Sequence, residues 1–197
     1  MNRLGHPIIS KIICALGLFV AASQPLSAEI AEHEETIPKA YSKDYVFLTM
    51  PYEQPYGKSR SLYSNDTVGA GIRYAHRLDS EWIVGLKFER KPVIRKDDKP
   101  MNLLVFSNQT QAVFRLYHPL YILVGTEISY VLPATKSSPP FTKDPDFDTE
   151  IAVGLNTSLW WLTSRKGIVE LNLSRWKGTK TNNLQGLETS LGYGIGF

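Results

Sequence analysis

The chain has almost no cysteine and, beyond its N-terminus, no long hydrophobic run. Its single cysteine, Cys14, lies in a segment that we expect to be removed, which excludes disulfides, thiolate metal sites and cysteine nucleophiles from the exported protein. After residue 22 the apolar stretches, such as 120–124, span only a few residues, whereas a membrane-crossing helix needs about 20. A formal net charge of +3 argues against a dedicated nucleic-acid-binding protein. Any membrane span must therefore be built from strands.

The N-terminus has the pattern of an export signal. Arg3 and Lys11 precede an apolar run at residues 12–22, and small residues follow as far as Ala28. We predict a signal peptide at residues 1–28, cleaved near Ala28, and an acidic, solvated leader at residues 29–43 in the periplasm. The remaining residues, 44–197, are enough for a single domain.

From about residue 44 apolar and polar side chains alternate, which is the pattern of strands with two different faces. The last strand is the clearest, because hydrophobic residues there alternate with Ser190, Gly192, Gly194 and Gly196. Strands are predicted at residues 45–50, 68–75, 82–89, 111–116, 122–130, 150–156, 169–174 and 190–197. The apolar segment 101–107 either extends the fourth strand or forms a short additional one.

The connections between these strands alternate in length. Short links are expected near residues 77–80, at 118–119 and at a link ending at 166–167. Longer ones are expected at residues 53–66, 90–100, 132–147 and 175–186. Short periplasmic turns and long outer loops are typical of bacterial outer-membrane barrels.

Within lipid a sheet can satisfy its backbone only by closing on itself, so the predicted fold is all-β, a closed up-and-down antiparallel transmembrane barrel of eight strands. A soluble barrel would carry its apolar side chains inside instead. The three glycines at 192, 194 and 196 favour the outward-apolar arrangement, because they suit a crowded interior. Aromatic residues near strand ends, where a lipid interface would hold them, favour it too: Tyr74, Trp82, Tyr117, Tyr121, Trp160, Trp161 and Trp176.

The C-terminus supplies a more specific signal. Leu191, Tyr193, Ile195 and Phe197 occupy alternate positions and end the chain on an aromatic residue. This pattern resembles the C-terminal assembly signal of outer-membrane barrels, and in size and strand count the chain is similar to the OmpA-barrel, OmpX and OmpW group. The resemblance implies the outer membrane of a Gram-negative bacterium, recognition by the barrel assembly machinery, and a monomer in contact with membrane lipid.

An eight-stranded barrel is narrow enough for its own side chains to fill. The charged residues expected to face the lumen are Arg73, Lys87, Glu89, Arg115, Glu127, Glu150, Glu170 and Glu188. They form either a proton or ion path or, as we favour, a buried salt-bridge network, because unpaired charges in a dry interior are very costly.

The predicted outer loops are basic, with twelve Lys and Arg residues against six acidic ones. These loops either contact the phosphates of lipopolysaccharide or are simply solvated. The candidate contacts are Lys58, Arg60, Arg95, Lys96, Lys99, Lys177 and Lys180.

Three functions remain: a structural or surface-interaction barrel, which we favour, a narrow channel for small solutes, and a lipid A-modifying enzyme. Such enzymes generally need a base, usually His, near the outer leaflet. His76 and His118 lie at predicted periplasmic strand ends, and the sequence has no metal-ligand spacing or phosphate-binding glycine loop. We therefore expect no enzymatic activity, no cofactor and no metal.

Overall fold

The computed structural model describes residues 37, 41–57, 59, 66–95, 99–135, 142–143, 148–179 and 184–197. The chain divides into two compact units, residues 1–34 and 35–197. The first unit lies outside the described residues, so the signal peptide and its cleavage near Ala28 stay predictions.

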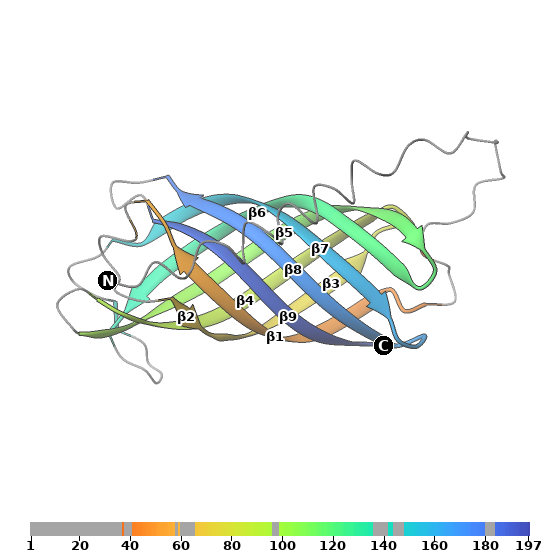
Figure 1. The fold of residues 1–197 in the computed structure, drawn as a ribbon, viewed down its shortest axis with the longest axis horizontal. Helices are drawn as coiled ribbons and strands as arrows, with labels where there is room; N and C mark the ends of the chain where they lie inside the picture. Colours follow the sequence, from red (N-terminus) through yellow and green to blue (C-terminus); the bar gives the residue numbers. More distant parts are fainter. Residues whose placement is uncertain are drawn as a thin grey trace, which may run out of the picture. The chain divides into compact units, whose positions relative to one another are not determined.

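The second unit is built from antiparallel strands (Figure 1). They are β1 (Asp44–Pro55), β2 (Thr67–Val68), β3 (Ala70–Arg77), β4 (Trp82–Ile94), β5 (Pro100–Tyr117), β6 (Leu120–Ala134), β7 (Glu150–Leu162), β8 (Gly167–Gly178) and β9 (Gln185–Gly196). β2 and β3 form one line, because both pair with β1 in the same register and Gly69 between them donates its N–H to the Pro51 carbonyl at 2.8 Å. The wall therefore has eight strands, as predicted.

The sheet closes because β9 pairs with β1 from Tyr45↔Gly196 to Pro55↔Gly186. Following paired residues once round the wall from Tyr45 returns to β1 at Pro55, ten residues further along. The successive partners are Ala75, Gly85, Gln109, Glu127, Gly154, Trp176 and Gly186. This stagger tilts the strands relative to the barrel axis, as closure requires.

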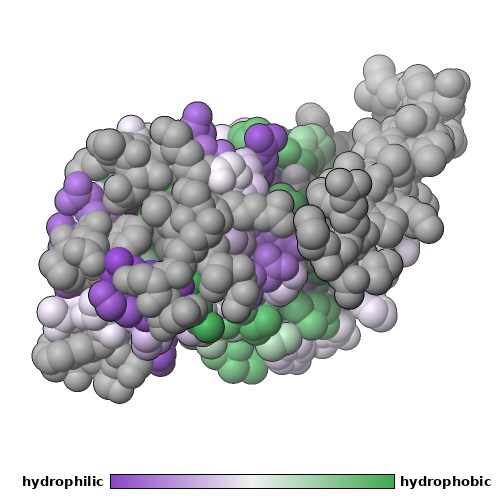
Figure 2. Space-filling model, turned by 60° about the vertical axis from the view of Figure 1, so that its left-hand side comes forward, coloured by the Kyte–Doolittle hydropathy of each residue, from purple (hydrophilic) through white to green (hydrophobic). Residues whose placement is uncertain are grey.

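The two ends of the barrel differ. The end with the short connections, here called the turn end, also carries the C-terminus, and the long connections lie at the opposite, loop end (Figure 1). The predicted alternation of faces is confirmed across the middle of the wall: Leu48 and Leu155 point outward and are 71% and 69% exposed, whereas Lys87 and Glu127 point inward and are buried. Figure 2 shows the resulting hydrophobic residues on the side of the barrel.

The strands run further toward the loop end than the sequence pattern indicated. β1 extends to Pro55 and β4 to Ile94, so Glu53 and Lys91, which we expected in outer loops, are buried strand residues. The segment 101–107 extends the fourth predicted strand, giving β5 a length of 18 residues. At about 3.3 Å per residue and a tilt near 45°, such a strand is taller than a bilayer's apolar band of about 25 Å.

Three aromatic residues that we assigned to the lipid interface lie inside the barrel instead. Tyr121, Trp160 and Trp176 are buried, whereas Trp82 and Trp161 are exposed on the outer face. The adjacent pair Trp160–Trp161 shows the reason: neighbouring strand residues face opposite sides, so nearness to a strand end does not decide the side.

The predicted leader, residues 29–43, is described only at residue 37 and from residue 41 onward, and there it contacts the barrel. Ile37 is buried in the apolar cluster at the turn end, and its carbonyl accepts a hydrogen bond from Arg77 at 3.0 Å. The Tyr41 hydroxyl lies 2.8 Å from His118 Nε2. This part of the leader is therefore attached to the barrel rather than solvated.

We predict that Gly194→Ala destabilises the barrel, because a Cβ at this inward position would clash with the Phe47 ring. Overpacking of this kind costs about 1–3 kcal/mol. Urea unfolding of the refolded protein in detergent measures the effect. Gly192→Ala is the matched control, since its Cβ would have no neighbour closer than 3.3 Å. Equal unfolding midpoints for the two variants would show that the Phe47 contact is not as described.

Candidate functional site

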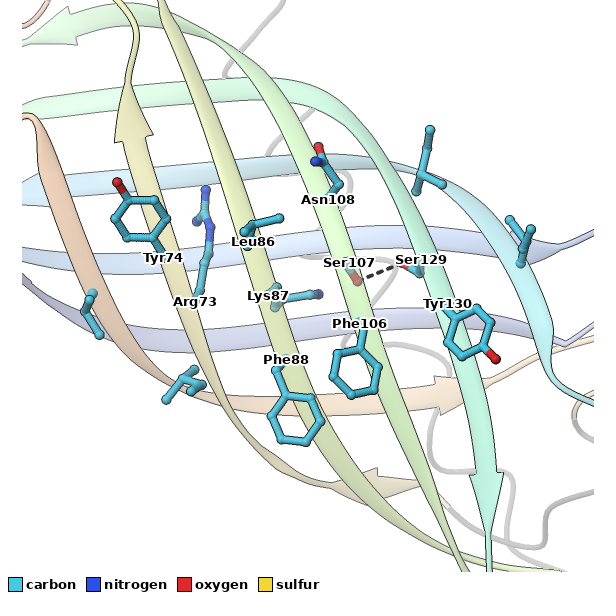
Figure 3. A pocket seen from close by; sticks show the side chains of 14 residues that line it. Arg73, Tyr74, Leu86, Lys87, Phe88, Phe106, Ser107, Asn108, Ser129 and Tyr130 are labelled. Atoms are coloured by element: carbon cyan, nitrogen blue, oxygen red, sulfur yellow. Dashed lines mark hydrogen bonds between the residues drawn. The ribbon is translucent and has the colours of Figure 1, made fainter. Parts of the chain in front are cut away.

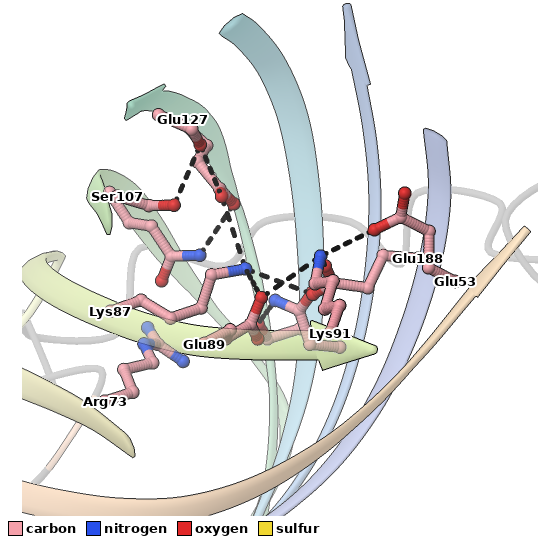
Figure 4. Close-up of polar contacts among 12 residues, drawn as sticks. Glu53, Arg73, Lys87, Glu89, Lys91, Ser107, Glu127 and Glu188 are labelled. Atoms are coloured by element: carbon pink, nitrogen blue, oxygen red, sulfur yellow. Dashed lines mark hydrogen bonds and ion pairs between the residues drawn. The ribbon is translucent and has the colours of Figure 1, made fainter. Parts of the chain in front are cut away.

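A cluster of charged side chains crosses the middle of the lumen (Figure 4). Lys87 of β4 lies at its centre. Its Nζ atom is 3.0 Å from Glu188, 3.2 Å from Glu127 and 3.3 Å from Glu89. These carboxylates come from β9, β6 and β4, so one ammonium group connects opposite walls of the barrel.

Lys91, two inward positions beyond Lys87 on β4, joins the same cluster from the loop end. Its Nζ atom is 2.7 Å from Glu53 and 3.2 Å from Glu89, and it also contacts Glu188. All of these side chains are buried. Two lysines thus hold four carboxylates.

A second ion pair lies nearer the turn end. The Arg73 guanidinium donates to Glu170 and to the Gln111 side-chain oxygen, and Trp160 Nε1 donates to Glu170 at 2.8 Å. The guanidinium carbon also lies 5.5 Å from the centre of the Phe47 ring. Arg73 is therefore held by a carboxylate, an amide and an aromatic face at once.

The structure brings six of the eight predicted lumen charges into these two groups: Arg73, Lys87, Glu89, Glu127, Glu170 and Glu188. Glu150 is buried separately at the loop end, where it accepts the Leu184 N–H at 3.2 Å. Arg115 lies elsewhere: it is exposed at the turn end of β5, beside an irregularity in the β5–β6 register. This irregularity ends the simple alternation on which its assignment depended.

Sequence reasoning missed Lys91 and Glu53, although a signal was present. Lys87, Glu89 and Lys91 follow one another at a spacing of two, so the inward series continues past the predicted end of the strand. Assigning residues from 90 onward to a loop placed Lys91 among the surface charges instead.

Apolar side chains lie on both sides of the charged region. At the turn end Trp160 packs against Phe47 and Tyr45, with ring centres 5.5 and 5.8 Å apart. The loop-end cluster consists of Val93, Met101, Leu103, Val105, Val131, Ala152, Trp176 and Leu184. The cluster around Lys87 and Lys91 is therefore enclosed between two apolar layers.

The outer face carries an apolar depression lined mainly by residues of β3 to β6, with Val46 of β1 and Ile151 of β7 (Figure 3). The rings of Phe88 and Phe106, on neighbouring strands, lie 4.7 Å apart there, with Leu86 and Tyr130 beside them. Most of the outward side chains around it are exposed hydrophobic groups, which fits a surface in contact with hydrocarbon, and the inward residues that also border it, such as Arg73 and Lys87, are buried.

Toward the loop end the outward residues change from apolar to basic. On β8, Leu171 and Leu173 are followed at the next outward positions by Arg175 and Lys177, both exposed. Arg175 Nε donates to the Tyr56 hydroxyl at 3.0 Å. On β4 the outward series Trp82, Val84, Leu86 and Phe88 leads to Arg90. We call Arg90, Arg175 and Lys177 the basic rim.

Of the residues proposed to contact lipopolysaccharide, the structure describes three. Lys177 belongs to the basic rim, Lys99 is exposed just before β5, and Arg95 is half-buried just after β4. Lys58, Arg60, Lys96 and Lys180 lie outside the described residues.

Within the described ranges, the two histidines lie at the turn end, where His76 contacts Asp44 at 2.7 Å and His118 contacts Tyr41. The described residues contain no group of three His, Cys, Asp or Glu side chains able to hold a metal ion. In the same residues, no helix is both long and apolar enough to cross a membrane.

Solved structures with the same fold are small outer-membrane barrels. The chain matches Neisserial surface protein A with a TM-score of 0.65 and 14% identity, over 79% of this chain and 98% of that one. It matches the N-terminal β-barrel domain of Pseudomonas aeruginosa OprF with a TM-score of 0.51 and 13% identity, over 79% and 99%. No family model and no curated protein sequence matches the chain. The predicted resemblance to small eight-stranded outer-membrane barrels is thus confirmed at the level of the fold.

We predict that Lys91→Met strongly destabilises the barrel, because it leaves Glu53 buried without its cation and leaves Glu188 with Lys87 alone. Removing one partner of a buried ion pair costs about 3–5 kcal/mol. Urea unfolding in detergent measures this loss, with Lys177→Met on the outer surface as the control. Adding Glu53→Gln to Lys91→Met should recover part of the stability. If both lysine variants unfold alike, the buried cluster does not stabilise the fold.

Proposed function

We propose that the protein resides in the outer membrane of a Gram-negative bacterium as a non-enzymatic barrel with a structural or surface-interaction role. In this orientation the turn end faces the periplasm and the loop end faces outward. The outward band of apolar side chains, which would be a liability in water, supports the location.

We further propose that the basic rim binds phosphates of lipopolysaccharide. The observation that carries this proposal is the change on β4 and β8 from outward apolar residues to outward Arg and Lys at the same end of the barrel. Apolar residues suit the hydrocarbon of the outer leaflet, and cations one step beyond it suit the phosphates at its surface. Arginine pairs well with phosphate because its planar guanidinium can donate two parallel hydrogen bonds.

One observation argues against each of the two alternative functions, the narrow solute channel and the lipid A-modifying enzyme. A solute would have to displace Trp160 and Phe47 at one end, Met101 and Leu103 at the other, and the ion pairs between them. Lipid A chemistry would need a base at the loop end, whereas His76 and His118 are held at the turn end by Asp44 and Tyr41.

The rim proposal predicts that the double variant Arg175→Gln/Lys177→Gln binds lipopolysaccharide more weakly, by about tenfold for each lost charge-assisted contact. Binding of refolded protein to lipopolysaccharide micelles is measured against salt and against enzymatically dephosphorylated lipopolysaccharide. The matched control is Arg165→Gln/Lys166→Gln, which removes two exposed charges from the turn end. Equal affinity of the wild type for the phosphorylated and dephosphorylated forms would reject the proposal.

The sealed lumen predicts that purified protein adds no stepwise conductance to a planar lipid bilayer. Ion pairs and aromatic rings fill the cross-section, and barrels with an open aqueous channel have many more strands. Insertion is verified separately, by protection of the barrel from added protease. Reproducible conductance steps from inserted wild-type protein would favour the channel alternative instead.

A further inference from the structure

Backbone pairing in the barrel wall ends early near the loop end, between β2 and β4. Backbone pairing of the β2–β3 line with β4 ends at Ala70↔Arg90, although β4 goes on pairing with β5 as far as Ile94↔Pro100. Pro92 accounts for the gap. Its carbonyl faces β2, where it accepts a hydrogen bond from the Thr67 hydroxyl, and its nitrogen faces the same side with no N–H to donate.

A pocket of about 420 Å³ lies where this pairing ends, here called the seam pocket. Its polar residues are Asp66, Thr67, Arg90 and Asn102, and its apolar lining includes Pro92, Ile94 and Met101. Arg90 Nε donates to the Asn102 side-chain oxygen at 2.9 Å, which fixes the guanidinium. Only one of its five N–H groups is used in this contact, so others can bind an anion.

Asp66 adds a carboxylate to the pocket, which prefers hydrogen-bond donors to anions. Its carboxylate is held by the Tyr52 hydroxyl at 2.6 Å and by the Gln54 amide at 3.3 Å. A ligand that fits both sides of the pocket therefore carries an anionic group for Arg90 and hydrogen-bond donors, such as hydroxyl or amide groups, for Asp66.

The height of Arg90 on the barrel wall indicates which class of ligand fits the seam pocket. Arg90 is eight residues beyond Trp82 on the same outward face of β4. At about 3.3 Å per residue and a tilt near 40°, this distance corresponds to roughly 20 Å of height, close to that of the apolar band. The apolar depression around Phe88 and Phe106 lies one outward position toward the turn end. A ligand in the seam pocket can therefore place acyl chains on that depression.

We propose that the seam pocket binds the phosphorylated saccharide headgroup of one outer-leaflet glycolipid molecule, with its phosphate on Arg90, its hydroxyl or amide donors on Asp66, and its acyl chains along Phe88 and Phe106. This inference rests on the proposed function and adds to it a single defined site. It differs from general attraction to a basic surface in one respect: it assigns a binding role to a carboxylate.

The binding role assigned to the Asp66 carboxylate can be tested directly. Purified protein in detergent is titrated with bisphosphorylated lipid A, with the same lipid after dephosphorylation and with inorganic phosphate, and bound lipid is counted by native mass spectrometry. Arg90→Gln should weaken binding of the first bound lipid A by about tenfold or more. Asp66→Asn should also weaken it, although removing a negative charge would strengthen a purely electrostatic attraction. The matched control Arg165→Gln should bind as the wild type does.

The outcomes separate the two proposals. If the wild type prefers phosphorylated lipid A but Arg90→Gln and Asp66→Asn bind it as well as the wild type does, the seam pocket is wrong and the proposed phosphate binding rests on Arg175 and Lys177 alone. Stronger binding by Asp66→Asn, or full competition by inorganic phosphate, would also overturn the seam pocket. If the wild type does not distinguish the phosphorylated lipid from the dephosphorylated one, the proposed function fails together with it.

Discussion

The pairing of β9 with β1 is the constraint on which the rest of the structure depends. It removes both free edges of the sheet, so backbone groups are satisfied within the wall and the outer face can be apolar. Closure with only eight strands also makes the interior narrow. Inward side chains at mid-barrel consequently lie out of contact with bulk water, and any charge among them has to find its partner across the lumen.

The arrangement of the lumen follows from that restriction. Lys87 and Lys91 on β4 reach carboxylates on β1, β6 and β9, so their ion pairs connect strands that share no backbone hydrogen bonds with β4. Apolar layers above and below exclude water, which strengthens each pair and equally raises the cost of breaking one. Lys91 connects the ion pairs to the loop-end apolar layer, because its Nζ atom also lies 5.9 Å from the centre of the Trp176 ring in that layer.

The sequence predicts the fold well wherever the two faces of a strand differ chemically. β9, with glycine and polar residues on one face and large apolar residues on the other, is the clearest case. Where both faces are apolar, the sequence left two alternatives open for residues 101–107, an extension of the fourth strand or a short additional strand, and the structure shows the extension. Leu103 and Leu104 are both buried in β5, so the alternation that marks a strand disappears although the strand continues. The side of the wall that an aromatic residue faces was predicted wrongly for a related reason, since the neighbours Trp160 and Trp161 face opposite sides.

The sequence predicts most of the charged residues that face the lumen, but not which of them pair with one another. Period two places Glu89 and Glu127 inside, yet which lysine each one meets depends on the stagger of the closed wall, which no local pattern encodes. Arg115 shows the limit of that argument: the residue has the inward phase, but it lies where the β5–β6 register shifts and the strand is ending.

The outer surface differs between its two ends in a way that bears on orientation. At the turn end Asp44 accepts a hydrogen bond from Tyr74 at 2.5 Å and contacts His76, and Arg115, Arg165 and Lys166 are exposed at the same end. At the loop end Arg90 and Arg175 retain guanidinium donors beyond their contacts with Asn102 and Tyr56. Both ends therefore carry exposed cations. At the loop end, however, Arg90, Arg175 and Lys177 continue the outward apolar series of β4 and β8, and the proposed binding of phosphate depends on this placement.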